Sequence, residues 1–254
     1  MNRYKLTIEY DGKNFNGWQK QKGMKTIQGV IEESLFKFSG KKITIYGAGR
    51  TDTGVHATGQ VAHLDLNEEG LEDKNSKLGK LTMGLNFYLS RLCDNRISII
   101  ETIKVDNEFH ARFSAIGRKY KYCILNRRTA SPLLKDKTWR IPNSLNIKLM
   151  KNASKHLLGK HDFTAFRSID CQAKSPIKTI DNITINNNGE LIEIYVEAKS
   201  FLMNQVRIIA GTLVDVGLLK KTDKDILAAL DKKDKKFSGP TAPSSALILQ
   251  KVIY

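Results

Sequence analysis

The chain has 254 residues and carries 42 Lys and Arg against 26 Asp and Glu, a formal net charge of +16. So basic a surface predicts a polyanionic partner, although a general preference for lysine in the composition is the alternative. The cysteines, Cys93, Cys123 and Cys171, lie far apart without a CxxC pair, which argues against a disulfide framework or a thiolate metal site. No stretch approaches the ~18 apolar residues of a membrane span, and no apolar signal region begins the chain. We therefore expect a cytoplasmic protein with no membrane contact.

The first half of the chain predicts the element order β-α-β-β-α-β. Apolar residues alternate over 4–10, and helical spacing over 27–38 lies between Thr26, a candidate N-cap, and Gly40. The later expected elements are a strand over 42–46, a glycine-punctuated loop over 47–59, a strand over 60–66, a helix over 77–89 and a strand over 96–105. This order is typical of a ferredoxin-like unit.

The second half predicts a related order of elements. The expected elements are a strand over 117–125, a helix over 147–158 ended by Gly159, a hairpin turning at Asn188-Gly189, helices over 204–216 and 223–230, and a strand over 247–253. We therefore predict an α+β fold of two ferredoxin-like, RRM-like α/β lobes with mostly antiparallel sheets. The lobes would cover 1–105 and 106–254 and be joined around a central basic cleft.

The segment from Gly47 to Ala57, GAGRTDTGVHA, is the most unusual in the chain. Its glycines permit sharp turns, and between them lie one carboxylate, one guanidinium, two hydroxyls and one imidazole. A loop of this composition between two strands presents reactive groups rather than filling a core. Two other interpretations are a plain turn capped by Asp52 and a phosphate-binding loop, although the latter lacks its Gly-Lys-Ser/Thr ending.

Together with further blocks in the same order along the chain, this loop resembles the tRNA pseudouridine synthase A family. The blocks are Tyr10-Asp-Gly12, Gly17-Trp-Gln19, Gln21, Phe109-His-Ala-Arg-Phe-Ser-Ala115, Arg118-Lys-Tyr-Lys-Tyr122, Leu157-Leu-Gly159, His161-Asp-Phe163, Ala165-Phe-Arg167, Ser200-Phe-Leu202, Val206-Arg207, Gly211, Val216-Gly217 and Thr241-Ala-Pro243. Several long blocks in order, nearly from end to end, are far more specific than one motif.

The resemblance implies an enzyme that isomerises uridine to pseudouridine in tRNA without a cofactor or a metal. The reaction breaks the bond from ribose C1′ to uracil N1, turns the base in place and joins C1′ to C5. Asp52 matches the catalytic carboxylate, which attacks the substrate covalently, at ribose or base, or stabilises and deprotonates the intermediate. Arg207 matches the cation that keeps this carboxylate ionised; without the family, Arg207 fits a solvent-facing helix position.

A paired uridine must leave its stem before it can react, and a side chain must fill the space it leaves. Arg50 matches the family residue assigned to that intrusion. Tyr120 matches the family tyrosine that lies against the target base. The strand pattern alone makes Tyr122 equally eligible, and ordinary packing is the alternative for both.

Other candidate RNA contacts lie within the matching blocks. They are His56, Arg112, Arg118, His161 and Arg167. The arginines suit bidentate phosphate binding, whereas the histidines fit hydrogen bonding within the fold equally well. The five histidines form no HExxH set, so we expect no zinc site.

The resemblance further implies a homodimer that acts on the anticodon stem-loop of several tRNAs, at positions 38–40. Two alternatives stay open: a non-catalytic RNA-binding protein on the same scaffold, and a synthase retargeted to other uridines of tRNA or ribosomal RNA. The sequence departs from the family pattern at Thr53, Ser90, Gln205 and Ala246. None of these removes a proposed catalytic group, but they loosen the inference about substrate choice.

Overall fold

The computed structural model describes residues 1–67 and 79–254, which form two compact units. The first unit comprises Met1–Ile116 and Leu249–Tyr254, and the second comprises Gly117–Ile248. These bounds differ from the expected 1–105 and 106–254 because segment 106–116 is bonded into the first unit. Arg3 donates to the carbonyls of Asn107 and Phe109, and the amide of Ile116 donates to the carbonyl of Ile253 at 2.8 Å.

In its described residues, the first unit is an antiparallel sheet covered by two helices. Its elements are β1 (Asn2–Tyr10), α1 (Ile27–Ser39), β2 (Tyr46–Gly47), β3 (His56–Leu66), α2 (Lys80–Cys93) and β4 (Ile97–Val105). β1 pairs with β4 and with β3, and β2 pairs with β3. Lys5 of β1 and Tyr46 of β2 both pair with His63, so they flank β3 on opposite sides. The resulting order, β4-β1-β3-β2, confirms the ferredoxin-like arrangement.

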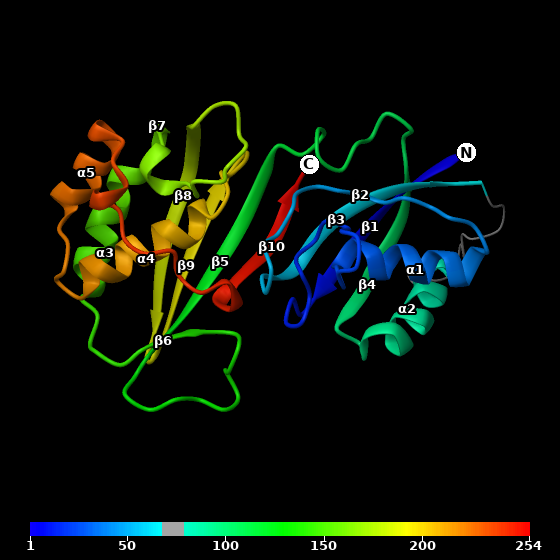
Figure 1. The fold of residues 1–254 in the computed structure, drawn as a ribbon, viewed down its shortest axis with the longest axis horizontal. Coiled ribbons are helices and arrows are strands. Elements are labelled where there is room, and N and C mark those ends of the chain that lie inside the picture. Colours follow the sequence, from blue (N-terminus) through cyan, green and yellow to red (C-terminus); the bar gives the residue numbers. More distant parts are fainter. Residues whose placement is uncertain (68–78) are drawn as a thin grey trace. The chain divides into compact units, whose positions relative to one another are not determined.

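Local sequence signals determine where α1 begins and ends and which face of α2 is buried. The Thr26 hydroxyl accepts a hydrogen bond from the amide of Gly29, and Gly40 ends α1 with a φ of +71°. Leu81, Leu85 and Leu89 give α2 a fully buried face. Figure 1 shows α1 and α2 side by side against the same face of the sheet. Of the helix expected over 77–89, residues 77 and 78 lie outside the described residues.

Two strands of the first unit differ from their expected bounds. β2 keeps only Tyr46 and Gly47 of the strand expected over 42–46, whereas β3 begins at His56 instead of residue 60. Near Gly59 the edge of β3 that faces away from β1 lies against the last residues of the chain, where the Thr58 hydroxyl donates to the carbonyl of Gln250 at 3.3 Å. The glycine-rich loop is therefore shortened to residues 48–55.

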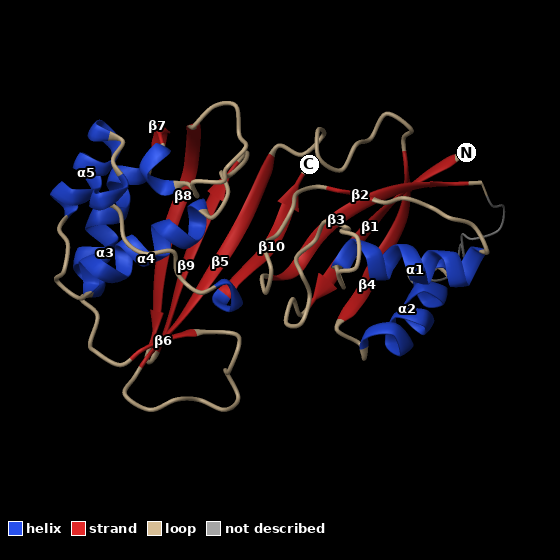
Figure 2. Ribbon diagram, viewed as in Figure 1, coloured by secondary structure: helices blue, strands red, loops and turns tan. Residues whose placement is uncertain are grey.

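The second unit consists of mostly antiparallel strands and three α-helices. Its elements are β5 (Gly117–Asn126), β6 (Trp139–Ile141), α3 (Ile147–Ser154), β7 (Gly159–Asp162), β8 (Ile177–Asn188), β9 (Leu191–Ala198), α4 (Gln205–Gly217) and α5 (Asp223–Lys232), while β10 (Leu247–Ile253) runs into the first unit. The strands follow the order β5-β9-β8-β7, and β6 adds a short parallel pairing to β5. In Figure 2 the helices α3, α4 and α5 gather beside this sheet.

The expected hairpin is present as β8 and β9. Asn188 pairs with Leu191, so the turn consists of Gly189, whose φ is +67°, and Glu190. The expected helix over 147–158 is shorter, because α3 passes into a 3-10 turn at Lys155–Leu157 and Gly159 then starts β7. The sequence did not predict β6 or β7, which are too short to give a periodic signal.

Candidate functional site

The glycine-rich loop is fixed at Thr51. The hydroxyl groups of Tyr10 and Thr51 are 2.8 Å apart, and the carbonyl of Thr51 accepts from the amide of Trp18 at 3.0 Å. Asp52 follows directly and is half-buried, and its carbonyl accepts from the amide of Val55 at 3.1 Å, closing a turn. The carboxylate is thus carried on a turn whose preceding residue is buried and hydrogen-bonded.

Two glycines outside the loop allow the chain to lie directly against it. A Cβ atom added to Gly12 would meet the carbonyl oxygen of Val55 at 2.0 Å. One added to Gly17, whose φ is +77°, would meet the carbonyl oxygen of Thr51 at 2.7 Å. The blocks Tyr10-Asp-Gly12 and Gly17-Trp-Gln19, separated from the loop in sequence, therefore form its packing surface.

Gly12→Ala is expected to displace the loop, because a methyl group cannot share the space of the Val55 carbonyl. The expected cost is about 1–3 kcal/mol of unfolding free energy, with a marked loss of catalytic rate. Gly49→Ala is the matched control, since its added Cβ meets nothing within 4 Å although it lies in the loop itself. Thermal unfolding and single-turnover rates would check this, and equal stability of the two variants would contradict it.

A buried glutamine also supports the loop, and the sequence analysis missed it. The Gln60 side chain is fully buried, and its amide donates to the carbonyl of Gly49 at 3.0 Å. Burial raises the pKa of nearby Tyr10 to about 12, so its hydroxyl stays protonated and can hydrogen-bond to Thr51. The strand also contains polar residues such as His63 and Asp65, so no sequence signal distinguished Gln60.

Arg50 lies within the loop and His56 directly follows it, and the two side chains differ in exposure. Arg50 is exposed, and its Nε donates to Gln19 Oε1 at 3.1 Å. His56 is buried; its Nδ1 lies 3.0 Å from the amide nitrogen of Gly12 and 3.1 Å from Asp11 Oδ1. An unprotonated Nδ1 accepts from Gly12, whereas a protonated one donates to Asp11. Both contacts are internal to the fold, and an RNA contact by His56 stays a prediction.

In the second unit, Arg207 is held by two hydrogen bonds. Its Nε donates to the carbonyl of Ala242 at 2.7 Å, and its Nη1 donates to Asn204 Oδ1 at 2.6 Å. The chain approaches α4 closely here, since a Cβ on Gly211 would lie 1.9 Å from the carbonyl oxygen of Pro240. The motif blocks at 206–211 and 241–243 therefore meet, and they fix the direction of one guanidinium.

The structure distinguishes Tyr120 from Tyr122. Tyr122 is fully buried, its hydroxyl donates to the carbonyl of Pro243 at 2.9 Å, and burial raises its pKa. Tyr120 is half-buried and meets the ring of Phe201 edge-on, with the centroids 5.3 Å apart. Tyr122 is therefore a core residue, and of the two tyrosines Tyr120 is the one with exposed surface for contact with a base.

The remaining candidate RNA contacts are spread over both units. Arg118 donates to the carbonyl of Lys199 at 2.6 Å, and His161 Nε2 lies 2.7 Å from the carbonyl oxygen of Leu158. Arg112 is exposed and lies 5.7 Å from the centre of the Phe113 ring. Arg167 is half-exposed and follows a 3-10 turn at Thr164–Phe166. Their RNA contacts stay predictions, as does the pairing of Asp52 with Arg207.

Residues 1–67 and 79–254 contain no cluster of three or more His, Cys, Asp or Glu side chains able to hold a metal ion. In the same residues, no helix has the length and apolar character needed to cross a membrane.

Known proteins are similar to this chain over most or all of its length. A family described as tRNA pseudouridine synthase matches residues 6–113 and 153–254. The tRNA pseudouridine synthase A of Bartonella henselae is 48% identical over 254 residues, which is 100% of both chains. That of Wolbachia pipientis wMel is 46% identical over 253 residues, 99% of this chain and 100% of the relative.

Among solved structures, one titled "Crystal Structure of a Cbf5-Nop10-Gar1 Complex" is 12% identical with a TM-score of 0.31, covering 83% of this chain and 54% of the other. A likeness that weak does not establish a shared fold. The relatives that are similar in sequence establish the family. The family match and full-length identities near one half confirm the resemblance, and the chain belongs to the tRNA pseudouridine synthase family, which is a family of isomerases.

Proposed function

We propose that this protein isomerises uridine to pseudouridine in the anticodon stem-loop of tRNA, with Asp52 as its catalytic carboxylate. The observation that carries the proposal is the position of Asp52 in a chain of this family: a half-buried carboxylate next to the buried, hydrogen-bonded Thr51. Such an arrangement keeps a charged group in place before the substrate arrives, which is how electrostatic catalysis avoids reorganisation.

The reaction conserves every atom of the nucleoside. The bond between C1′ and N1 breaks, a bond between C1′ and C5 forms, C5 loses its proton and N1 gains one. No oxidant, reductant or group donor is consumed, so the protein needs to supply only a nucleophile or base, a means of holding the detached ring and a route for one proton. Asp52 is the proposed nucleophile, and its carboxylate is also suited to move the C5 proton.

Arg207 is the proposed cation for this carboxylate. Desolvation of an aspartate favours its neutral form, and a guanidinium nearby opposes that tendency. The bonds from Arg207 to Ala242 and Asn204 support this role because they restrict the side chain to one direction. A lysine would offer the same charge but could not form the same planar set of bonds.

Arg50 and Tyr120 are proposed to handle the extruded nucleotide. The exposed Arg50 side chain, bonded through Nε to Gln19, can extend into the space that a flipped uridine leaves. The half-buried Tyr120 ring can support the uracil face while the base turns. A cytoplasmic homodimer is part of the same proposal, by family resemblance.

Mapping pseudouridines in RNA from cells with and without the gene tests this function. Loss of pseudouridine from the anticodon stem-loop of several tRNAs is expected. Loss at other tRNA or ribosomal RNA positions would favour a retargeted synthase. No loss anywhere, with tRNA binding by the purified protein, would favour a non-catalytic RNA-binding protein.

Binding of tRNA is expected to weaken steeply with salt, because a protein with a net charge of +16 binds RNA largely through phosphates. Between about 50 and 200 mM salt we expect at least a roughly tenfold loss of affinity, since each phosphate contact releases counterions. Filter binding or fluorescence anisotropy at several salt concentrations would measure the slope. An affinity that is independent of salt would contradict a phosphate-dominated interface.

A further inference from the structure

Six aromatic and imidazole rings of the first unit form a contiguous group, which we call the ring cluster. Its members are Tyr46, His63, Phe109, His110, Phe113 and Tyr254. Tyr46 stacks on His63, with centroids 5.2 Å apart and planes 22° apart. His110 lies 4.6 Å from His63 and 4.4 Å from Phe113. The proposed chemistry of Asp52 uses none of these residues.

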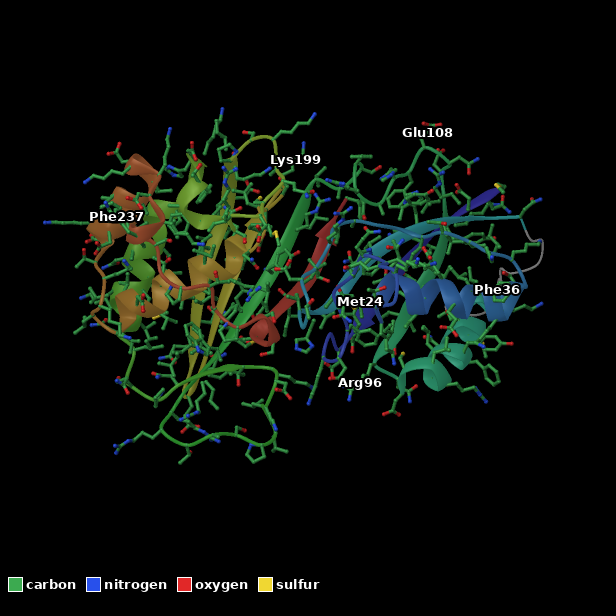
Figure 3. All side chains as sticks on the ribbon, viewed as in Figure 1. Met24, Phe36, Arg96, Glu108, Lys199 and Phe237 are labelled. Carbon is green, nitrogen blue, oxygen red and sulfur yellow. The ribbon has the colours of Figure 1, made fainter. Side chains whose placement is uncertain are left out.

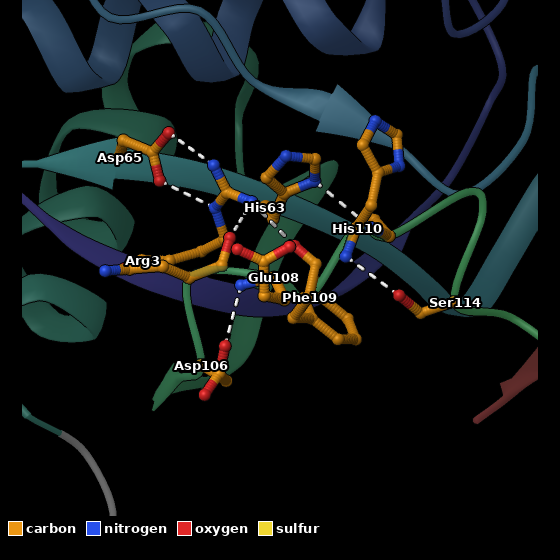
Figure 4. Close-up of polar contacts among 10 residues, drawn as sticks. Arg3, His63, Asp65, Asp106, Glu108, Phe109, His110 and Ser114 are labelled. Atoms are coloured by element: carbon orange, nitrogen blue, oxygen red, sulfur yellow. Dashed lines mark hydrogen bonds and ion pairs between the residues drawn. The ribbon is translucent and has the colours of Figure 1, made fainter.

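The segment that carries half of the cluster is fixed by Arg3. Arg3 donates to both carboxylate oxygens of Asp65, at 2.7 and 2.8 Å, and to the carbonyls of Asn107 and Phe109. Figure 4 shows this guanidinium between β3 and the segment from Asp106 to Ser114. The Arg3 hydrogen bonds lower the pKa of Asp65, so the ion pair is kept over a wide pH range.

The two histidines are hydrogen-bonded to main-chain amides. His63 Nδ1 accepts from the amide of Ala111 at 3.2 Å, and His110 Nδ1 accepts from the amide of Arg112 at 3.1 Å. Burial, followed by the nearby His110 and Arg3, lowers the pKa of His63 to about 4, so this ring is neutral at physiological pH. The two histidine rings are therefore anchored to the main chain, and the cluster is centred on an uncharged, buried ring.

The ends of the cluster are exposed. Tyr46 is 52% exposed and Phe113 is 76% exposed, whereas His63 is only 2% exposed. One face of Tyr46 covers His63, so the exposed area includes its other face. Large aromatic rings usually lie inside proteins, and two exposed ones that each pack on a histidine ring point to a ligand with a flat apolar face.

Charges around the cluster favour an anionic ligand on one side. Arg112 lies 5.7 Å from the centre of the Phe113 ring, and Lys5 lies 5.7 Å from that of Tyr254. The acidic residues of the same segment are Asp106 and Glu108, and the Asp106 carboxylate accepts from the amide of Glu108. Figure 3 shows Glu108 at the outer edge of the unit. Arg3 is paired with Asp65, so the basic groups that accompany the exposed ends of the cluster are Arg112 and Lys5.

We infer that the ring cluster is a stacking platform for unpaired nucleotides of the tRNA substrate, separate from the glycine-rich loop. Bases stack on aromatic side chains whatever their sequence, and cations beside the rings bind the phosphates. His56 and His63 stand seven residues apart on β3, which is roughly 23 Å at ~3.3 Å per residue. The platform would therefore hold a part of the tRNA distant from the reacting uridine. This inference rests on the proposed function.

A second copy of this chain is the other candidate occupant of these rings. The cores of protein interfaces are depleted in lysine, whereas Lys5 lies beside the Tyr254 ring of the cluster. The net charge of +16 also favours RNA as the occupant of this face. The observations thus favour the nucleic acid, and the experiment below includes the alternative.

Phe113→Ala and Tyr46→Ala test the platform, with Phe36→Ala as the matched control. Phe36 is 46% exposed on α1, away from Glu108 in Figure 3. An unmodified tRNA transcript is titrated into each protein, and the dissociation constant is measured by fluorescence anisotropy. Each platform variant is expected to bind about tenfold more weakly, whereas Phe36→Ala should stay within about twofold of the wild type. Tyr46→Phe keeps the ring and should restore binding.

Two results would overturn the inference. One is an unchanged tRNA affinity for Phe113→Ala, whose exposed side chain can be removed with little effect on folding. The other is dissociation of a protein dimer, seen by sedimentation without RNA, at unchanged affinity per protomer, since this would assign the rings to a contact between copies. A wild-type protein that binds tRNA but makes no pseudouridine would instead refute the proposed function, and the binding comparison would still decide the platform.

Discussion

Asp52→Asn is expected to abolish pseudouridine formation while tRNA binding is retained. Asparagine has nearly the same shape as aspartate, so the turn closed by the bond from Val55 to residue 52 should persist. The substitution removes the negative charge and the nucleophilic oxygen, and loss of a catalytic carboxylate or nucleophile in an enzyme costs roughly 10⁴-fold or more in rate. Single-turnover conversion of a tRNA transcript, followed by pseudouridine mapping, measures this loss.

Asp94→Asn is the matched control for this experiment. Asp94 is exposed after α2 in a left-handed conformation with a φ of 52°, which asparagine adopts as readily. The Asp94→Asn substitution makes the same change of charge in the same unit, and it should leave the catalytic rate near that of the wild type. Equal activity of Asp52→Asn and wild type would refute the enzymatic role of Asp52, and loss of binding as well as rate would indicate a misfolded loop instead.

The second large effect is expected at Arg207. Arg207→Met should lower the catalytic rate by about 10²–10³-fold, the range seen when one preorganised electrostatic group is removed from an active site. Arg207→Lys should recover only a part of it, because an ammonium cannot reproduce the planar bonds to Ala242 and Asn204 while pointing in the same direction. The measurement is the single-turnover rate at saturating tRNA.

Arg140→Met provides the corresponding control in the second unit. Arg140 is exposed, and its Nη1 donates to the carbonyl of Arg128 at 2.7 Å. It therefore resembles Arg207 in binding a main-chain carbonyl, but it lies outside the motif blocks. If the two methionine variants lost tRNA affinity equally and kept the same rate, Arg207 would be a general phosphate contact and not the partner of Asp52.

Together the two variants separate the chemistry from the binding of the substrate. Asp52 and Arg207 belong to different units, and each is anchored within its own unit. Combining Asp52→Asn with Arg207→Met should lower the catalytic rate little more than Asp52→Asn alone does. The effects of two residues that act together in one step are not additive. Full additivity would mean that the two side chains act in separate steps.

The sequence by itself determined the local elements and the family. Period-two alternation predicted β1, and helical spacing with Thr26 and Gly40 predicted α1, because these signals come from residues close together in the chain. The element order of the first half also predicted its sheet, because few topologies fit a β-α-β-β-α-β succession. The ordered motif blocks then led to the tRNA pseudouridine synthases.

Tertiary structure alone decided how residues far apart in the chain are paired and buried. Tyr122 and Tyr120 share one strand pattern, but only Tyr122 is fully buried, and its hydroxyl donates to the carbonyl of Pro243, 121 positions away. The return of Leu249–Tyr254 to the first unit and the fixing of segment 106–116 by Arg3 likewise depend on distant partners. Local periodicity carries no information on such partners, because burial depends on which elements pack together and not on the order of neighbouring residues.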